Sequence, residues 1–351
     1  MVDIPAELPR RREDPARSAR QAPHPRGGPN PRGNYARHYA ALDLGTNNCR
    51  LLIARPQGPG FAVIDAFSRI VRLGEGLAAS GRLSDAAIER TLGALRVCAD
   101  KLKRRNVVLA RSVATEACRR AANGADFIER AHAETGIRLD IISAEEEARL
   151  AVLGCHVLIE PGSDPALIFD IGGGSTELVL VDTSGPSPRV LDWHSVPWGV
   201  VSLTESAGGG DGAEGLAAAY ARMRALAGES MAPFAARLPR GVTRPRLLGT
   251  SGTVTTLGSV HLGLTQYDRP AVDGLIAPTT AMRAICRSLA AQSIAERATV
   301  ACIGHERADL VVAGCALLET IMDLWPAERL GIADRGIREG ILRRLMGEQR
   351  P

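Results

Sequence analysis

Two glycine-bearing turns carry the residue types of a phosphate site. The first reads Asp43-Leu44-Gly45-Thr46-Asn47, and the second reads Asp170-Ile171-Gly172-Gly173-Gly174-Ser175-Thr176-Glu177. Glycine lets the backbone approach a ligand closely and adopt positive φ angles. Successive backbone N–H groups in such a turn form a concavity of the size of an anion. Two such turns in one chain predict two related half-domains that grip one phosphorylated ligand.

A carboxylate precedes each turn at the end of a strand-like run. Asp43 follows the apolar run from Tyr39 to Leu42, and Asp170 follows the run from Ala166 to Phe169. After each turn the chain continues into a second run of strand type. Carboxylates at such positions can hold a hard cation that shields phosphate oxygens. The two aspartates are therefore candidate ligands of a hard cation.

A third turn joins an apolar strand to a helix. It reads Leu247-Leu248-Gly249-Thr250-Ser251-Gly252-Thr253 and leads into a helix expected over 254–262. Free N–H groups and the helix dipole favour anions at a helix N-terminus, which makes Gly252 and Thr253 candidate phosphate-binding residues. None of the three turns is a P-loop or a dinucleotide-binding fingerprint. An ordinary tight turn explains any one of these runs equally well, but the three together favour a ligand site.

Two further segments suit acid–base chemistry and charge stabilisation. Glu145-Glu146-Glu147 opens a helix, so at least one of the three carboxylates can face a cleft. Partial burial near like charges would raise the pKa of that carboxylate, which suits a general base. Either Arg119 or Arg120 could bind phosphate and offset charge in the transition state. The non-catalytic explanations are helix-dipole stabilisation for the glutamates and a surface salt bridge for the arginines.

These residues need a scaffold of alternating strands and helices. In the first half, strands are expected over 39–42, 49–54, 61–68, 106–113 and 137–142, with helices over 84–103 and 125–134. In the second half, strands are expected over 166–169, 177–181, 190–196, 247–248 and 330–333, with helices over 144–153, 213–235, 254–262, 279–290 and 306–324 and after Gly336. This order is typical of α/β units with mixed sheets.

The composition is that of an ordinary globular protein. A length of 351 residues exceeds what one core usually carries, so two domains are expected. No apolar stretch approaches the roughly 20 residues that span a bilayer, and the first residues lack the apolar core of a signal peptide. We therefore expect a cytoplasmic protein that makes no membrane contact. The seven cysteines are scattered without a C-x-x-C pair and predict neither disulfides nor a zinc site.

Residues 1–37 differ from the rest of the chain. They hold eight arginines, four acidic residues and seven of the 21 prolines without an apolar period, so a disordered arm is expected. The net charge of this arm is +4, which equals that of the whole chain, so residues 38–351 are neutral overall. A neutral body argues against a dedicated nucleic-acid surface, although the arm alone could touch nucleic acid.

Several motifs, in the same order, resemble those of the exopolyphosphatase and guanosine pentaphosphate phosphohydrolase family, within the actin, hexokinase and sugar-kinase superfamily. The match runs from about Tyr39 to Leu345, with motifs at 41–47, 114–119, 142–150, 169–177, 197–204, 249–253, 306–309 and 334–340. The resemblance implies an α/β fold of two actin-like (ribonuclease H-like) domains with mixed five-stranded sheets and the active site between them. The implied domains are 38–147 plus a C-terminal helix over about 336–351, and 148–335.

The resemblance also implies roles for single residues. Glu147, which precedes the alanine of the E-E-A-R run, is the expected general base, and Arg119 is expected to bind phosphate. The second turn matches the family's essential loop, whose carboxylates are expected to position Mg²⁺ and water. The expected metal ligands are Asp43, Asp170 and Glu177. The expected phosphate-binding residues are Gly45, Thr46, Asn47, Gly172, Gly173, Gly174, Ser175, Thr176, Gly252 and Thr253.

Larger members of the family carry a further C-terminal helical domain, which helps them to bind long polyphosphate and to dimerise. No counterpart is expected in this sequence, which leaves processivity open, and a homodimer is the family precedent.

The sequence thus predicts a Mg²⁺-dependent hydrolase that releases terminal phosphate from inorganic polyphosphate, from guanosine pentaphosphate, or from both. The main alternative is a non-catalytic protein that binds guanosine tetraphosphate or pentaphosphate and regulates a partner. Two further hypotheses are a small-molecule kinase on the same fold and a nucleic-acid binder that acts through the arm.

Overall fold

The computed structural model describes residues 37–185, 188–208, 212–238 and 244–347. The chain from Ala36 onward groups into one compact unit. The arginine- and proline-rich arm expected over 1–37 lies outside the described residues, apart from Arg37. None of the helices in the described ranges is long and apolar enough to cross a membrane.

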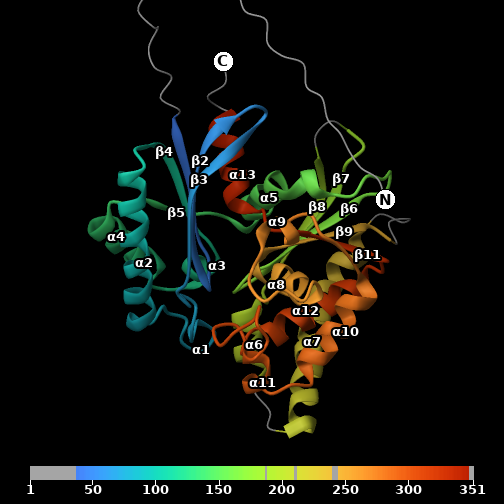
Figure 1. Cartoon of the computed structure of the whole chain (residues 1–351). Coiled ribbons are helices and arrows are strands. Elements are labelled where there is room, and N and C mark those ends of the chain that lie inside the picture. The colour runs from blue at the N-terminus through green and yellow to red at the C-terminus, as the bar shows by residue number, and fades with distance from the viewer. Residues whose placement is uncertain (1–36, 186–187, 209–211, 239–243, 348–351) are drawn as a thin grey trace, which may run out of the picture. The chain divides into compact units, whose positions relative to one another are not determined.

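The first sheet has five strands in the order β3-β2-β1-β4-β5, as expected (Figure 1). They are β1 (His38–Leu44), β2 (Asn48–Gln57), β3 (Gly60–Ile70), β4 (Val107–Ala114) and β5 (Leu139–Ile141). The first three pair antiparallel, whereas β4 runs parallel to β1 and β5 runs parallel to β4. We call this sheet and the helices α1–α4 the first lobe. The helices are α1 (Leu77–Ser80), α2 (Asp85–Arg104), α3 (Glu116–Arg120) and α4 (Gly124–Thr135).

The second sheet has six strands in the order β10-β11-β9-β6-β7-β8, where five were expected. They are β6 (Ala166–Ile171), β7 (Thr176–Asp182), β8 (Arg189–Val196), β9 (Arg246–Thr250), β10 (Ile276–Pro278) and β11 (Arg329–Ala333). The additional strand is β10, which pairs antiparallel with β11 at the edge of the sheet. Its three residues end in a proline, which is tolerated at an edge because no neighbouring strand needs its missing N–H.

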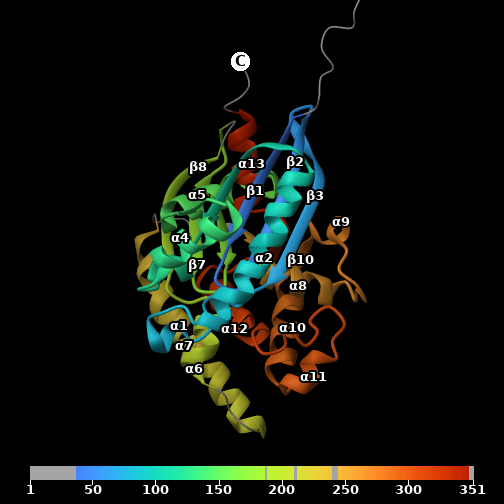
Figure 2. The same cartoon turned by 90° about the vertical axis from the view of Figure 1, so that its left-hand side faces the viewer.

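We call the second sheet and the helices α6–α12 the second lobe. The helices are α6 (Val200–Ala207), α7 (Gly212–Arg237), α8 (Ser251–His261), α9 (Arg269–Val272), α10 (Thr279–Ala290), α11 (Ile294–Ala298) and α12 (Val311–Leu324). The apolar faces of α7, α8, α10 and α12 pack on one side of this sheet and form the largest core of the described residues (Figures 1 and 2). The helix expected from Glu306 begins only at Val311, because turns occupy 305–310.

Two helices lie between the sheets. They are α5 (Ala144–Cys155), which a 3-10 turn over His156–Leu158 follows, and α13 (Ile337–Gly347). Leu150 of α5 packs with α13 against the first sheet, whereas Val152 packs against the second sheet. The two helices touch where a Cβ atom on Gly340 would lie 2.1 Å from the carbonyl oxygen of Leu150, so only glycine fits there. This packing fixes α5 with its first turn at the boundary between the lobes.

Candidate active site

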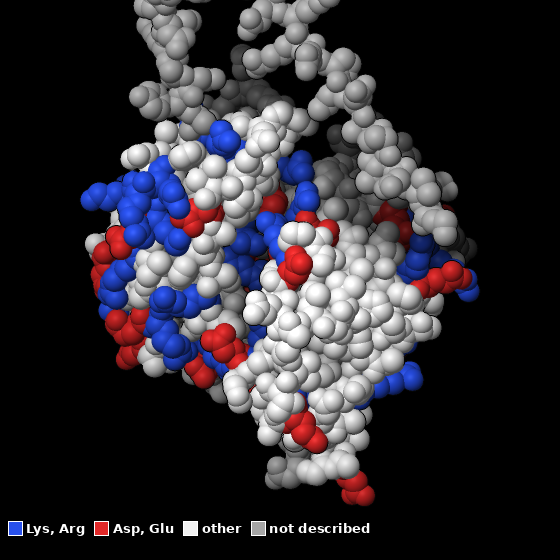
Figure 3. Space-filling model, viewed as in Figure 1, with Lys and Arg blue, Asp and Glu red and all other residues white. Residues whose placement is uncertain are grey.

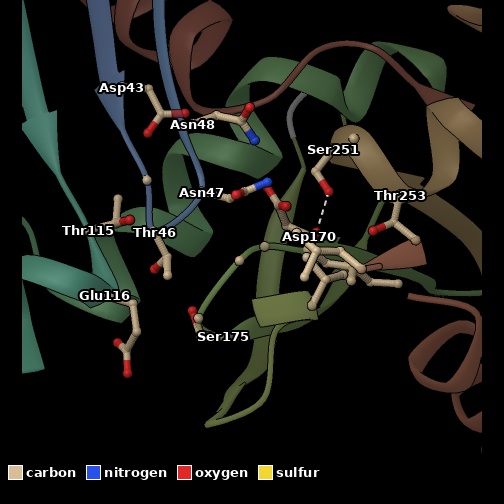
Figure 4. Close-up of a pocket in the computed structure, with 18 of the residues that line it drawn as sticks. Asp43, Thr46, Asn47, Asn48, Thr115, Glu116, Asp170, Ser175, Ser251 and Thr253 are labelled. Atoms are coloured by element: carbon tan, nitrogen blue, oxygen red, sulfur yellow. Dashed lines mark hydrogen bonds between the residues drawn. The ribbon is translucent and has the colours of Figure 1, made fainter. Parts of the chain in front are cut away.

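A cavity lies where the turns of the two lobes meet, and it has about 120 Å³ of space for water (Figure 4). The strand-end turns β1–β2 and β6–β7, the start of α5 and the start of α8 contribute to its wall. Of the expected site residues, the wall contains Asp43, Gly45, Thr46, Asn47, Glu147, Asp170, Gly172, Gly173, Gly174, Ser175, Gly252 and Thr253. The fold therefore brings all three turns to one place.

The two hairpins that carry the first and second turns are equivalent in register. Asp43 of β1 lies opposite Arg50 of β2, and Asp170 of β6 lies opposite Glu177 of β7. Opposite residues of an antiparallel pair project to the same face of the sheet. Arg50 thus occupies, in the first lobe, the position that Glu177 occupies in the second. The sequence did not single out Arg50 as a site residue. Aligning the two strand–turn–strand segments on Asp43 and Asp170 would have placed Arg50 at the position of Glu177.

The first and second turns touch each other. A Cβ atom on Gly174 would lie 2.6 Å from Oγ1 of Thr46, and one on Gly173 would lie 3.0 Å from the backbone nitrogen of Asn47. None of the glycines expected at the site has a positive φ angle, so positive φ is the wrong reason for glycine here. For Gly173 and Gly174, the close approach of the two turns is the reason that the structure supports.

Two buried polar atoms of the first turn lack a hydrogen-bond partner among the described residues. They are Oγ1 of Thr46 and Oδ1 of Asn47. A buried polar atom without a partner costs about 1–3 kcal/mol, so such atoms at a cavity indicate a ligand or ordered water. A hydroxyl can donate to a phosphate oxygen, and an amide oxygen can accept from water bound to a cation. Both atoms therefore suit a hydrated cation and phosphate.

The start of α8 offers an anion site in the same cavity. No side chain caps this helix, because the hydroxyl of Thr250 donates instead to the carbonyl oxygen of Arg335 at 2.5 Å. Ser251 has a positive φ of 82°, and its hydroxyl donates to the carbonyl oxygen of Ile171 at 2.6 Å, which ties α8 to the second turn. An uncapped N-terminus exposes backbone N–H groups to an anion.

The three glutamates at the start of α5 point to different partners. Glu145 pairs with Arg149 at 2.7 Å on the surface, and Glu146 pairs with Arg111 at 2.6 Å. Glu147 is only 7% exposed and alone of the three lines the cavity. The rotation between neighbouring residues of a helix thus directs three identical side chains to three different surroundings. This placement favours Glu147 as the base, the choice that the family resemblance implied.

Arg119 is committed to carboxylates and not to the cavity. Its five N–H donors all have partners: two bonds go to Oε2 of Glu116, two to Oε2 of Glu147, and one to the carbonyl oxygen of Ile142. A guanidinium has only five donors, so none is left for phosphate in this arrangement. Arg119 also does not line the cavity. The expected phosphate-binding role therefore has no support here, and the geometry instead shows Arg119 holding Glu147.

Two expected residues of the second turn also lie outside the cavity wall. Thr176 is fully buried, and its hydroxyl donates to the carbonyl oxygen of Trp198 at 2.7 Å. The hydroxyl of Thr176 therefore supports the turn from within the protein, and a phosphate-binding role for this residue stays a prediction. Glu177 is 2% exposed and accepts a hydrogen bond from Ser195 at 3.1 Å. Its charge is close enough to act on the neighbouring carboxylates.

Four carboxylates share this region and repel one another. Burial, followed by the charge of Asp43, raises the pKa of Asp170 to about 6, although Arg50 opposes the shift. Burial and the charge of Asp170 raise the pKa of Glu177 to about 8. The pKa of Asp43 is also raised, mainly by burial. Burial and then the charge of Glu177 hold the pKa of Glu147 well above its ordinary value, while Arg119 lowers it.

This excess of negative charge suits a divalent cation. Within the described ranges, no group of three or more His, Cys, Asp or Glu side chains could hold a metal ion by itself. Asp43, Asp170 and Glu177 thus do not form a site made of protein ligands alone. Mg²⁺ commonly keeps several waters and binds one or two carboxylates together with substrate phosphates. Asp43 and Asp170, which line the cavity, fit that mode.

Two cationic side chains that the sequence left without a role also line the cavity. Nη2 of Arg50 lies 3.3 Å from the position of a Cβ atom on Gly252, so the arginine of the first lobe reaches the start of α8. Arg307 donates from Nη1 to the hydroxyl of Thr256 in α8 at 2.8 Å. Arg307 stands within the 306–309 motif, for which the resemblance implied no role. Both arginines place positive charge at the wall of the cavity.

Comparison with known proteins places these features in a family. Residues 52–349 match the model of the Ppx/GppA phosphatase family. Relatives named exopolyphosphatase 2, from two strains of Mycobacterium tuberculosis, are 31% identical over 322 residues, which cover 88% of this chain and 98% of theirs.

Solved structures agree with this assignment. A crystal structure of an exopolyphosphatase-like protein has a TM-score of 0.76 at 28% identity and covers 88% of this chain and 98% of its own. The Ppx/GppA family member of Aquifex aeolicus has a TM-score of 0.72 at 26% identity and covers 90% of this chain and 99% of its own. Two mixed sheets flanked by helices confirm the expected actin-like fold class. From its sequence match and its fold, the chain belongs to the Ppx/GppA phosphatase family.

Proposed function

We propose that this protein is a divalent-cation-dependent phosphohydrolase that releases the terminal phosphate of inorganic polyphosphate. One observation carries the proposal: the buried carboxylate of Glu147 lines the cavity formed by the phosphate-type turns, while Arg119 holds one of its oxygens. The name of the Mycobacterium tuberculosis relatives favours polyphosphate as the substrate class.

The phosphate chain would bind between the lobes. Backbone N–H groups at the start of α8 and the guanidinium groups of Arg50 and Arg307 supply positive charge on one side of the cavity. On the face viewed in Figure 3, basic side chains gather over the first lobe and along its border with the second. Much of the second lobe's surface on that face carries no charge. On the face in view, the basic side chains along the border would therefore attract a polyanion.

Glu147 would act as the general base. Arg119 contacts only Oε2, which leaves Oε1 to accept a proton from water. The water oxygen attacks the terminal phosphorus, the bond to the bridging oxygen breaks, and the shortened chain leaves with the electrons of that bond. Arg119 lowers the pKa of Glu147 against the larger rise that burial and the neighbouring carboxylates cause, and so favours the ionised form that accepts the proton.

Asp43 and Asp170 are the residues that would hold Mg²⁺. The cation, when bound, neutralises charge on the phosphate oxygens and on the carboxylates around it. The unpartnered Asn47 Oδ1 fits a water of such a cation, and the unpartnered Thr46 hydroxyl fits a phosphate oxygen. Glu177 lies opposite Asp170 in the strand pair, and its pKa of about 8 means that it adds negative charge mainly at alkaline pH.

Guanosine pentaphosphate remains an alternative substrate, because it also presents a terminal phosphoanhydride. Phosphate release should be measured with Mg²⁺ on long polyphosphate, short polyphosphate and guanosine pentaphosphate. We expect release from polyphosphate and its loss without the divalent cation. Release from the nucleotide alone would transfer the proposal to that substrate. Absence of release from all three, with measurable nucleotide binding, would favour the non-catalytic regulatory protein.

A further inference from the structure

Hydrogen bonds cross from one lobe to the other at the side where α1 meets α6 (Figure 1). Nη1 of Arg72 donates to Oδ2 of Asp309 at 2.7 Å, and Nη2 donates to Oδ1 of Asp309 at 3.2 Å and to the carbonyl oxygen of Glu306 at 3.1 Å. Nearby, the backbone nitrogen of Gly76 donates to Oε1 of Glu205 at 2.9 Å. We call the bidentate Arg72–Asp309 pair the clasp.

In the first lobe, backbone hydrogen bonds join the segment that carries Arg72 to the first turn. The backbone nitrogens of Val71 and Arg72 both donate to the carbonyl oxygen of Asn47, at 2.9 and 3.0 Å. The backbone nitrogen of Gly74 donates to the carbonyl oxygen of Thr46 at 2.9 Å. Arg72 adopts a positive φ of 47°, a strained conformation that persists only where surrounding contacts enforce it. The position of Arg72 is thus coupled to that of the first turn.

In the second lobe, the clasp holds the turn that carries Arg307. Its two anchor points, the carbonyl group of Glu306 and the carboxylate of Asp309, flank Arg307 in the chain. Arg307 lines the cavity and contacts Thr256 in α8. The clasp therefore connects the first turn, in the first lobe, to residues 306–309 of the second lobe. Arg307, whose side chain lines the cavity, lies within that segment.

We propose that Arg72 and Asp309 are positioning residues that hold the lobes together and fix Arg307 at the phosphate chain. This inference rests on the proposed function for the identity of the ligand. Both side chains of the clasp are 30% exposed, so water can replace their bonds when the lobes separate. The clasp can thus form when the cavity is filled and break for ligand exchange. Neither residue lines the cavity, so neither is assigned a catalytic role.

Charge reversal and its repair test the clasp. The variants are Asp309→Asn, Arg72→Glu, Asp309→Arg and the double variant Arg72→Glu with Asp309→Arg, each in the Glu147→Gln background. The matched control is Glu134→Gln, because Glu134 is also 30% exposed and pairs with two arginines, Arg96 and Arg130, within the first lobe. Binding of inorganic tripolyphosphate with Mg²⁺ is measured by calorimetry, and the radius of gyration is measured by X-ray scattering.

We expect Asp309→Asn to weaken tripolyphosphate binding about tenfold, the scale of losing one charge-assisted pair, and each charge reversal to weaken it more. The double variant should recover most of the loss, because the pair is restored with its charges exchanged. The radius of gyration of the single variants should rise above that of the control. Binding and radius equal to those of Glu134→Gln, or loss without recovery in the double variant, would overturn the proposal.

A failure of the proposed function can be distinguished from a failure of the clasp proposal. If the unmodified protein releases no phosphate from any substrate, the hydrolase proposal falls. The scattering comparison between Asp309→Asn and Glu134→Gln needs no turnover and still decides whether the clasp holds the lobes together.

Discussion

Nη1 and Nη2 of Arg119 both lie 3.2 Å from Oε2 of Glu147, so one guanidinium grips one oxygen of the buried carboxylate through two donors. Glu116 holds the same guanidinium through Nε and Nη2. Arg119 is thus sandwiched between two glutamates and cannot turn away from Glu147 without losing several charge-assisted bonds. This relationship makes Arg119 the cation that opposes the rise in the pKa of the proposed base, which burial and the charge of Glu177 cause.

Removal of the Arg119 charge should shift the pH dependence of catalysis. Burial raises the pKa of Glu147 and Arg119 opposes that shift, so in Arg119→Gln the pKa rises further. Glu147 then becomes ionised only at higher pH, and the acidic limb of the kcat/KM profile moves upward. Near pH 7 we expect a loss of roughly 10²-fold or more, the usual scale of general-base catalysis.

The control for this experiment is Arg120→Gln, because Arg120 approaches Glu116 only at 3.9 Å and does not contact Glu147. Its profile should match that of the unmodified protein. Arg119→Lys keeps a charge and should move the acidic limb less than Arg119→Gln does. An unshifted limb in Arg119→Gln would show that this arginine does not set the ionisation of the base.

Stabilisation by Mg²⁺ should grow with pH. The folded-state pKa values of Asp170 and Glu177 are about 6 and about 8, above their ordinary values of 3.8 and 4.5. Between about pH 4 and pH 8 the folded protein therefore binds more protons than the unfolded chain, so the stability of the metal-free protein falls as pH rises. A divalent cation offsets this repulsion only where the carboxylates are ionised.

Thermal unfolding checks this dependence. The increase in Tm on adding Mg²⁺ should be larger at pH 8 than at pH 5, and Asp170→Asn should reduce the difference. An increase of equal size at both pH values would argue that the cation binds elsewhere.

The contact between the two turns should not tolerate a methyl group. In Gly174→Ala the new Cβ atom would lie 2.6 Å from Oγ1 of Thr46 and 3.0 Å from Cγ of Glu116, which forces the turns apart. We expect destabilisation of about 1–3 kcal/mol, as for other overpacked sites, and at least a tenfold loss of kcat/KM.

A second glycine supplies the matched control. A Cβ atom on Gly93, inside α2, would meet nothing within 4 Å. Gly93→Ala should therefore stabilise the protein by about 0.5–1 kcal/mol through helix propensity and leave kcat unchanged. Denaturant unfolding and phosphate release distinguish the two variants, and full activity in Gly174→Ala would refute the requirement for close contact.

The repeated strand–turn–strand pattern was the strongest sequence signal, because it combines apolar runs with glycine and a carboxylate at fixed offsets. It placed β1, β2, β6 and β7 within a few residues of their bounds and located the cavity wall. The edge strand β10 was missed, because three residues ending in proline carry no alternation of apolar and polar positions. The sequence pattern also could not show which of the three glutamates faces the cavity, because this depends on how α5 packs between the two sheets.

The partners of single side chains could not be predicted for a related reason. Thr176 has the residue type of a phosphate ligand, but the register of β7 directs it to Trp198. Arg119 has the residue type of a phosphate ligand too, but two glutamates from separate segments occupy all but one of its donors. Arg307 lies 160 residues from Glu147 in the chain, and only the folding of the second lobe brings it to the cavity.

The division into domains at 147/148 stays a prediction.

The most direct test of the proposed base compares Glu147→Gln with Glu145→Gln. Both residues lie in the first turn of α5, but Glu145 is 46% exposed and pairs with Arg149 on the surface. Single-turnover phosphate release from short polyphosphate and tripolyphosphate binding are measured with Mg²⁺ for both variants. We expect that Glu147→Gln loses about 10²–10⁴-fold in release and keeps binding, while Glu145→Gln retains both. Undiminished release in Glu147→Gln, or an equal loss in Glu145→Gln, would contradict the assignment of Glu147 as the base.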